Sequence, residues 1–430
     1  MSLRILHTSD WHLGLATGAV SRHEDHRRFL DWLIDTLEAR KVDALVIAGD
    51  VFDTFHPSSE ALSSYYGFLA RVPATGVQNV VVVGGNHDSP AQLNAPREVL
   101  TAMNVHVVGG VPPAGDDRDR LLIPLQPRGS PDPTAVCLGV PFVHEYRLGV
   151  RTTDPDPTVV RAAFREAFAG LYTDLVDRAE ARFPELPILA TGHLTLGTGS
   201  RRDDYPQEIH QVGTIEGLPT SIIDDRIRYV ALGHIHRAYP VHGSVAQYSG
   251  SPIPCSVTEM NAPRQVLIVD LPSEGPAEVQ PVDVPVTRGL VTIEGPVQDV
   301  LQELRSLTWD TPLPPLVFVQ VITDSVVSGL STQLHECLDA HPESARPALV
   351  HVQQRAATHA EETAAVTPTK ALEELEPSEV FDALLATRTY EDATRSQLRR
   401  AFDQIVQVNE DDFSSMLEDV TGGSPTTEAP

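Results

Sequence analysis

The chain has 430 residues, too many for one ordinary hydrophobic core, so we expect two or three folding units. Hydrophobic residues make up 41% of it, and no apolar run approaches the roughly 18 residues that span a bilayer, so we expect no membrane partner. The net charge of −27 disfavours a chain that binds nucleic acid by itself, because phosphate contacts normally require Lys and Arg.

The N-terminus and the cysteines indicate the compartment. In MSLRILHTSDWHL, the polar Asp10 and His12 follow the first apolar residues directly, which is not the layout of a secretory signal peptide. Cys137, Cys255 and Cys337 lie far apart and form no CxxC pair. They fit reduced thiols better than a disulfide framework, so we expect a cytoplasmic protein.

Residues 1–272 alternate short apolar runs with amphipathic stretches. Leu30, Leu33 and Leu37, and then Leu62 and Leu69, recur at helical spacing. Alternating strands and helices predict an α/β fold, in which functional sites form at the carboxyl ends of strands. Five runs rich in Val, Ile and Leu predict buried strands: Arg4–Thr8, Ala44–Ala48, Val80–Val83, Ile188–Thr191 and Tyr229–Leu232.

A smaller domain is expected next along the chain. The Pro-, Glu- and Gly-rich stretch at Pro272–Pro285 predicts a linker. Residues 283–355 then predict a small α+β capping domain, with strands at Leu290–Ile293 and Val317–Ile322 around a helix at Val297–Leu307.

The C-terminal part is predicted to be helical over residues 370–420 and disordered over residues 421–430. Phe381 with Leu384, and Phe402 with Ile405, belong to two apolar faces at helical spacing. Such faces either pack on their own domain or dock a partner. Residues 351–430 carry 16 acidic and 6 basic side chains, so they supply −10 of the net charge.

Side chains that can bind metals follow the predicted strands. Five segments, SDWHLG, GDVFD, GGNHD, TGH and GHIH, each lie at a strand end. Carboxylate, imidazole and amide donors together suit Mn²⁺, Fe²⁺ or Zn²⁺, whereas Mg²⁺ prefers oxygen. The ligand-capable residues of these segments are Asp10, His12, Asp50, Asn86, His87, His193, His234 and His236.

Two segments place ligands two residues apart, as Asp10 with His12 and His234 with His236. On extended backbone such residues point to the same side, so each pair can face one metal cluster. Each segment alone can be read more simply: Asp-x-His can be solvated surface, GHIH a satisfied histidine pair, and GNHD a local turn. All five in this order, each at a strand end, favour a metal site.

The order DxH, GDxxD, GNHD, GH, GHxH resembles the calcineurin-like metallophosphoesterase superfamily over about residues 3–270. The strings GNHDSP, TGHLTLGTGS, GHIHR and YSGSPIP are similar to the SbcD nuclease family in particular. The narrower resemblance extends to the second domain and the helical segment through their layout. It implies a β-sandwich flanked by helices, followed by the capping domain and a C-terminal helical segment.

The resemblance also implies a centre of two divalent metal ions, with Mn²⁺ as the expected metal. Asp10, His12 and His236 would hold one ion, Asn86, His193 and His234 the other, and Asp50 would bridge both.

The resemblance also implies catalytic or supporting roles for three further residues. His87 would contact the scissile phosphate and protonate the leaving oxygen, a task that suits a group titrating near neutral pH. Asp53 or Asp88 would accept a hydrogen bond from a neighbouring histidine and orient it. In some relatives the position of Asp53 is a histidine that positions the phosphate, and the Asp in this chain puts that role in doubt.

The implied activity is that of an ATP-regulated DNA nuclease subunit, a 3′-to-5′ exonuclease on duplexes and an endonuclease on single strands and hairpins. The implied partners are DNA and an SbcC-like coiled-coil ATPase, in a heterotetramer with two copies of this chain. The ATPase would dock on the helical segment at Pro377–Val408, which Ala356–Thr369 would connect flexibly to the rest of the chain. The ATPase would also supply the DNA-binding surface that so acidic a chain lacks. This chain contains no GxxxxGK[ST] loop for ATP.

Some of these features are also compatible with a different activity. A phosphodiesterase acting on a nucleotide or phosphoprotein would keep the same site, although it has little need of the capping domain and helical segment. A scaffold without activity would have lost ligands, and here all are present. Helices are also predicted near Ser58–Val72 and Asn94–Met103, and the apolar stripe of each fits either a dimer contact or core packing.

Overall fold

The computed structural model describes most of the chain. The described ranges are 2–112, 118–150, 156–197, 217–259, 262–323 and 327–355, together with Phe381, Leu398, Arg399 and Phe402. The chain divides into two units, Met1–Ala357 and Thr358–Pro430. Within the described ranges, no helix is long and apolar enough to cross a bilayer.

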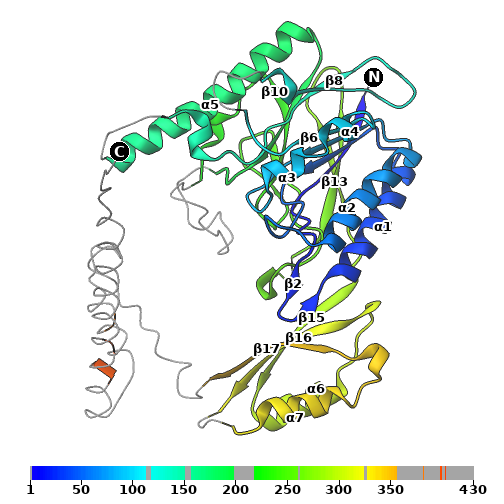
Figure 1. The fold of residues 1–430 in the computed structure, drawn as a ribbon, viewed down its shortest axis with the longest axis vertical. Coiled ribbons are helices and arrows are strands. Elements are labelled where there is room, and N and C mark those ends of the chain that lie inside the picture. The colour runs from blue at the N-terminus through cyan, green and yellow to red at the C-terminus, as the bar shows by residue number, and fades with distance from the viewer. Residues whose placement is uncertain are drawn as a thin grey trace, which may run out of the picture. The chain divides into compact units, whose positions relative to one another are not determined.

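A six-stranded sheet carries the N-terminal part of the first unit (Figure 1). Strands β1, β4, β5 and β6 run parallel to one another, and β13 and β14 extend the sheet antiparallel beyond β1. The order across the sheet is β14 (Glu278–Asp283), β13 (Gln265–Leu271), β1 (Leu3–Thr8), β4 (Ala44–Ala48), β5 (Asn79–Val83) and β6 (Val105–Val108).

A second six-stranded sheet packs against the first. Side chains from both sheets, such as Val46 of β4 and Val230 of β10, are fully buried in one shared core, so the pair forms a β-sandwich. The order is β11 (Tyr239–Pro240), β12 (Ala246–Tyr248), β10 (Ile227–Gly233), β9 (Ile188–His193), β8 (Ala135–Leu138) and β7 (Leu122–Leu125).

Helices flank this sandwich, as the family resemblance implies. Helices α1 (His23–Ala39) and α2 (Ser59–Arg71) bury Leu33 and Phe68 in a second core against the first sheet. The long helix α5 (Pro157–Arg182) packs in the core of the second sheet, although no helix is predicted there from the sequence. A short hairpin, β2 (Ala16–Thr17) and β3 (Val20–Ser21), precedes α1.

Most predicted elements of this unit are confirmed, and one predicted helix is wrong. The five predicted strands correspond to β1, β4, β5, β9 and β10. The helix predicted at Asn94–Met103 is instead two short helices, α3 (Pro90–Asn94) and α4 (Arg97–Thr101). Pro96 lies between them, and proline has no amide hydrogen with which to continue a helix.

The linker predicted at Pro272–Pro285 is also corrected, because strand β14 lies within it. β14 pairs with β13 along its whole length, with Val279 opposite Val269 and Val282 opposite Val266. Pro281 is compatible with this strand because β14 is at the edge of the sheet, where a missing ladder hydrogen bond is tolerated.

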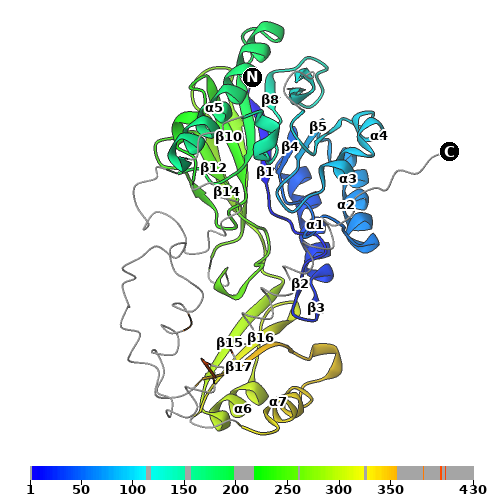
Figure 2. The same ribbon diagram turned by 60° about the vertical axis from the view of Figure 1, so that its left-hand side comes forward.

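The smaller domain consists of three parallel strands and two helices (Figure 2). It has its own apolar core, to which Ile293, Leu304, Val319, Leu334 and Cys337 contribute buried side chains. The exact domain boundaries stay predictions. In chain order the elements are β15 (Arg288–Gly295), α6 (Val297–Ser306), β16 (Leu313–Ile322), α7 (Leu330–Leu338) and β17 (Ala348–Arg355).

The predicted helical segment and tail lie outside the described residues, apart from four side chains. Among these, the rings of Phe381 and Phe402 stack with centroids 4.1 Å apart and an interplanar angle of 5°. These two residues come from the two predicted apolar faces.

Candidate metal centre

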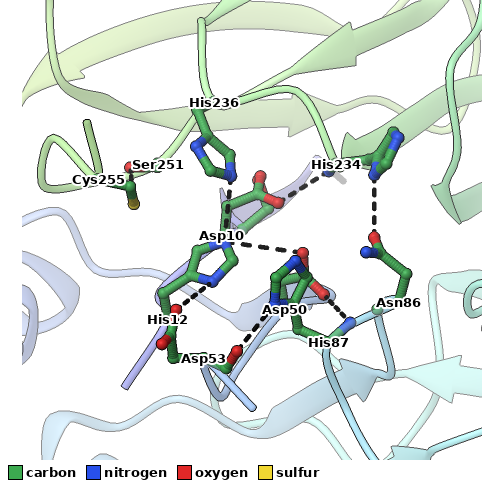
Figure 3. A network of polar contacts seen from close by, with 12 residues as sticks. Asp10, His12, Asp50, Asp53, Asn86, His87, His234, His236, Ser251 and Cys255 are labelled. Carbon is green, nitrogen blue, oxygen red and sulfur yellow. Dashed lines mark hydrogen bonds and ion pairs between the residues drawn. The ribbon is translucent and has the colours of Figure 1, made fainter. Parts of the chain in front are cut away.

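The predicted ligands lie at neighbouring strand ends of the two sheets, and Figure 3 shows those that it labels close to one another. Asp10 follows β1, Asp50 follows β4 and Asn86 follows β5. On the second sheet His193 ends β9 and His234 follows β10. Because β1, β4 and β5 are parallel neighbours, and β9 and β10 are too, their carboxyl ends bring these side chains together.

Four ligand candidates have a left-handed backbone. The angle φ is 53° at Asp10, 48° at His12, 48° at Asp50 and 94° at His234. The expectation that extended backbone aligns Asp10 with His12 is therefore wrong. Hydrogen bonds between loops hold the turn instead, because the Asp10 amide donates to the Gly49 carbonyl at 2.9 Å and the His12 amide to the Asp50 carbonyl at 3.0 Å. Non-glycine residues held in this region cost about 1–3 kcal/mol each and cluster at functional sites.

Two glycines let the backbone approach the ligands closely. A Cβ atom at Gly85 would lie 2.1 Å from Asp50 Oδ1, and one at Gly49 would lie 2.2 Å from His193 Nδ1. Neither distance is possible for a real side chain. Gly49 also has a φ of 93°, which favours glycine over other residues.

One group of candidate ligands gathers around His12. Its Nε2 atom lies 3.1 Å from Nε2 of His236 and 3.7 Å from Oδ2 of Asp50. Asp10, His12 and Asp50 each offer a ligand atom, and these atoms lie within 4.8 Å of one another. All three side chains are buried, and Asp10 Oδ1 also accepts the His234 amide at 2.8 Å.

A second group gathers around Asn86. Its Oδ1 atom lies 3.1 Å from His193 Nε2 and 3.0 Å from His234 Nδ1. Oδ2 of Asp50 lies 3.3 Å from the same His193 Nε2 atom. Asp50 therefore contacts both groups, which is the position that a bridging carboxylate requires.

The tautomer of His193 indicates that this site fits a cation. Its Nδ1 lies 2.9 Å from the Ala48 carbonyl oxygen, where only an N–H can donate. In neutral His193 the lone pair of Nε2 then faces the oxygens of Asn86 and Asp50. Lone pairs that face one another repel unless a proton or a metal ion lies between them. The donor chemistry fits a divalent metal with mixed nitrogen and oxygen ligands.

Without metal, protons are expected to take that place. Burial alone lowers the pKa of His193, but the Asp50 carboxylate outweighs burial and raises it to about 9. Burial likewise lowers the pKa of His12, whereas Cys255 and Asp53 raise it, with a result of about 9. We therefore expect both rings to hold a proton at neutral pH when no metal is bound.

Metal binding is consequently predicted to release protons. A metal binds neutral imidazole, so the affinity for Mn²⁺ should rise from about pH 6 to pH 8 by about tenfold per pH unit for each proton displaced. Isothermal titration calorimetry in buffers of different ionisation enthalpy counts these protons. A binding heat independent of the buffer, with an affinity independent of pH, would contradict the prediction.

His87 lies beside these groups on the exposed side of the site (Figure 3). Its ring is 4.9 Å from the ring of His12, centroid to centroid. Its amide donates to Asp50 Oδ1 at 2.9 Å, and its Nδ1 lies 2.8 Å from the Asp53 carbonyl oxygen. Nδ1 therefore carries a proton, which leaves Nε2 for another partner.

Asp53 and Asp88 have different surroundings. Asp53 Oδ1 lies 3.3 Å from His12 Nδ1, where it can orient that ring. The hydrogen bonds described for Asp88 come from backbone amides: those of Val51 at 3.1 Å, Phe52 at 2.9 Å and Gly85 at 2.8 Å. Asp88 thus joins the loops after β4 and β5. Among the contacts described for these two carboxylates, the one with a histidine ring is made by Asp53.

Glu259 belongs to the site but is absent from the sequence prediction. Its Oε1 lies 2.9 Å from Nδ1 of His236, and its Oε2 lies 3.2 Å from Nη1 of Arg264. The side chain is buried, and its pKa is about 2 because His236 and neighbouring donors outweigh the effect of burial. No motif or spacing marks Glu259, since it lies 23 residues beyond its histidine.

Glu259→Gln is predicted to weaken metal binding without removing a ligand. Loss of a carboxylate that orients a metal-binding histidine typically costs about 10–100-fold in affinity. Mn²⁺ titration of the variant should therefore show a higher Kd, whereas Glu278→Gln, on the exposed edge of β14, should leave it unchanged. An equal Kd for Glu259→Gln and the unaltered chain would show that Glu259 does not contribute to metal binding.

The chain matches known families and proteins over most of its length. Residues 3–238 match the calcineurin-like phosphoesterase family, and residues 286–389 match the family described as type 5 capsule protein repressor C-terminal domain. The chain is 31% identical over 407 residues to the SbcD component of nuclease SbcCD from Escherichia coli K12, covering 93% of this chain and 97% of that protein. It is 34% identical over 366 residues to the same component from Rhodobacter capsulatus, covering 80% and 89% of the two chains.

Proposed function

Because this chain belongs to the calcineurin-like phosphoesterases and, within them, to the SbcD family, we propose that it is the nuclease half of an ATP-regulated DNA-processing complex. Its enzyme class is that of a metal-dependent phosphodiesterase, and its function is that of an SbcCD nuclease subunit. A phosphodiesterase acting on a nucleotide or phosphoprotein is not favoured, since the relatives match over most of the chain. The observation that carries the proposal is the contact of Asp50 with both ligand groups.

The site would hold two divalent ions, and Mn²⁺ is our proposal for both. When bound, such a pair neutralises a phosphodiester and lowers the pKa of a water molecule. The mixed nitrogen and oxygen donors support Mn²⁺ over Mg²⁺, which prefers oxygen alone. One ion would be held by Asp10, His12 and His236, the other by Asn86, His193 and His234, with Asp50 shared.

His87 would act as the general acid of the cleavage. Its Nδ1 is engaged by the Asp53 carbonyl, so the protonated ring presents a second N–H at Nε2. We propose that this proton passes to the sugar oxygen that leaves the phosphate. The hydrogen bond from the His87 amide to Asp50 fixes the backbone of the acid relative to the shared ligand.

The proposed substrates are duplex ends, cut from 3′ to 5′, and single-stranded or hairpin DNA. The proposed partner is an SbcC-like coiled-coil ATPase that binds residues 370–420 and supplies the basic surface that a chain of net charge −27 lacks. Two copies of this chain would form the heterotetramer with two ATPase chains. Val99, which is 69% exposed, and Met103, which is 41% exposed, support a dimer contact near α4.

Metal removal and return test this proposal. The chain is stripped with a chelator and assayed on end-labelled duplex DNA with Mn²⁺, with and without the ATPase partner and ATP. We expect no cleavage without metal, cleavage with Mn²⁺, and stimulation by the partner. Hydrolysis of a small phosphodiester, with no DNA cleavage even in the presence of the partner, would overturn the proposal.

A further inference from the structure

Cys255 lies beside the candidate metal centre but is not one of its expected ligands. It ends the segment YSGSPIPC after β12, and Figure 3 shows it on the same side of the site as His236. Its Sγ atom and one ring nitrogen each of His12 and His236 all lie within 4.8 Å of one another. Cysteine and two histidines are a donor set that zinc and other borderline-soft ions prefer.

The backbone around Cys255 is held by the same carboxylate that orients His236. The Cys255 amide donates to Glu259 Oε2 at 3.1 Å, and Glu259 Oε1 lies 2.9 Å from His236 Nδ1. The buried Arg22 donates to the Pro254 carbonyl at 2.9 Å and so anchors the preceding residue. The position of the thiol is therefore coupled to the position of a metal-binding histidine.

The thiol has partners in its own loop and at the metal centre. Sγ lies 3.5 Å from Ser251 Oγ and 3.7 Å from the Ile253 carbonyl oxygen, which are ordinary lengths for the weak hydrogen bonds of sulfur. It also forms a side-chain hydrogen bond with His236. Sulfur and nitrogen ligands of one zinc ion lie roughly 3.0–3.5 Å apart, given bond lengths of about 2.3 Å and 2.0 Å and the angles of about 90–110° between neighbouring ligands. A separation of at most 4.8 Å can reach that range by rotation of the Cys255 side chain.

We propose that Cys255 is an additional ligand of the ion that His12 and His236 hold, and that it strengthens the binding of borderline and soft divalent ions such as Zn²⁺, Co²⁺ and Cd²⁺ at this site more than the binding of Mn²⁺. On binding, the S–H bond breaks, the proton passes to solvent, and a sulfur lone pair forms the bond to the metal. The inference rests on the proposed metal centre and adds a residue to it. Its consequence is that Zn²⁺ competes with Mn²⁺ at this site more strongly than an all-nitrogen-and-oxygen site would allow.

Cobalt spectroscopy tests the ligand directly. Co²⁺ is added to the metal-free full chain, and the thiolate-to-cobalt charge-transfer band is followed in the near ultraviolet. We expect the band in the unaltered chain and in Cys137→Ala and Cys337→Ala, whose thiols are buried elsewhere in β8 and α7. We expect no band in Cys255→Ser. A band that survives in Cys255→Ser, or none in the unaltered chain, would overturn the proposal.

Competition between ions supplies a second readout. Cys255→Ser should raise the Kd for Zn²⁺ by about tenfold or more, and the Kd for Mn²⁺ by much less. Equal changes for the two ions would mean that the thiol is not a selective ligand. Neither experiment measures DNA cleavage, so a chain that binds Co²⁺ through Cys255 but cuts no DNA would refute the proposed function and leave this inference standing.

Discussion

His87→Gln is expected to lower kcat on duplex DNA by about 10²–10⁴-fold, the usual contribution of a general acid. Glutamine keeps a polar side chain near the phosphate but cannot deliver a proton to the leaving oxygen. Because no predicted ligand is removed, the metal content should stay the same. Single-turnover cleavage of end-labelled DNA with Mn²⁺ measures the loss, and elemental analysis of the same samples measures bound metal.

The matched control for this variant is His242→Gln. His242 is an exposed histidine in the turn between β11 and β12, so the same substitution there should leave kcat unchanged. Substrates with a leaving group that needs no proton sharpen the test, because His87→Gln should cleave them almost normally. If His87→Gln loses bound metal together with activity, His87 would instead support the structure of the loop that holds Asp50, whose Oδ1 accepts the His87 amide.

Asp25→Ala is expected to lower the free energy of unfolding by about 3–5 kcal/mol, the cost of breaking a buried ion pair from one side. The Asp25 side chain on α1 is fully buried. It accepts Nη2 of Arg22 at 3.0 Å, and both its oxygens accept Nε of Arg288 at 3.1 Å and 3.0 Å. Removal of the carboxylate leaves two largely buried guanidinium groups without this countercharge. Urea denaturation followed by circular dichroism measures the change.

Asp31→Ala is the control on the same helix. Asp31 is half-buried, with a side chain 41% exposed, and it pairs with Arg27 and Arg71. Such surface pairs contribute about 0–1 kcal/mol. If both variants lose the same small amount, the cluster around Asp25 contributes little to stability. A large loss of unfolding free energy for Asp25→Ala would mean that the cluster stabilises the packing of α1 against β15 of the smaller domain, because Arg288 lies on β15.

The same cluster extends to the metal centre. Arg22 bonds Asp25 through one terminal nitrogen and the Pro254 carbonyl through the other. Pro254 precedes Cys255, so a chain of direct contacts leads from Arg288 in the smaller domain to the loop beside His236. Asp25→Ala should therefore also alter the cobalt spectrum expected from Cys255.

By itself, the sequence determined which five segments of the first domain are buried strands and that the predicted ligands follow them. Apolar runs such as Ala44–Ala48 bury every residue of a strand, so hydrophobicity alone marks them. Polar residues shortly after such runs, such as Asp50 and Asn86, are expected to lie at the same edge of the sheet, because the carboxyl ends of parallel strands point in one direction. The predicted ligands lie at this edge, whereas their roles toward a metal stay predictions.

Only the tertiary structure decided the contacts that no local pattern encodes. Glu259 and Cys255 reach His236 through the path of the loop after β12, and β14 pairs with β13 despite its proline. Asp10 and His12 adopt left-handed backbone because bonds from the neighbouring loop hold them there. The physical reason is the same in each case. The spacing of apolar residues along a segment indicates which of its faces is buried. The hydrogen-bond partners of a side chain and the backbone angles of a loop depend instead on how segments that are distant in the sequence pack together.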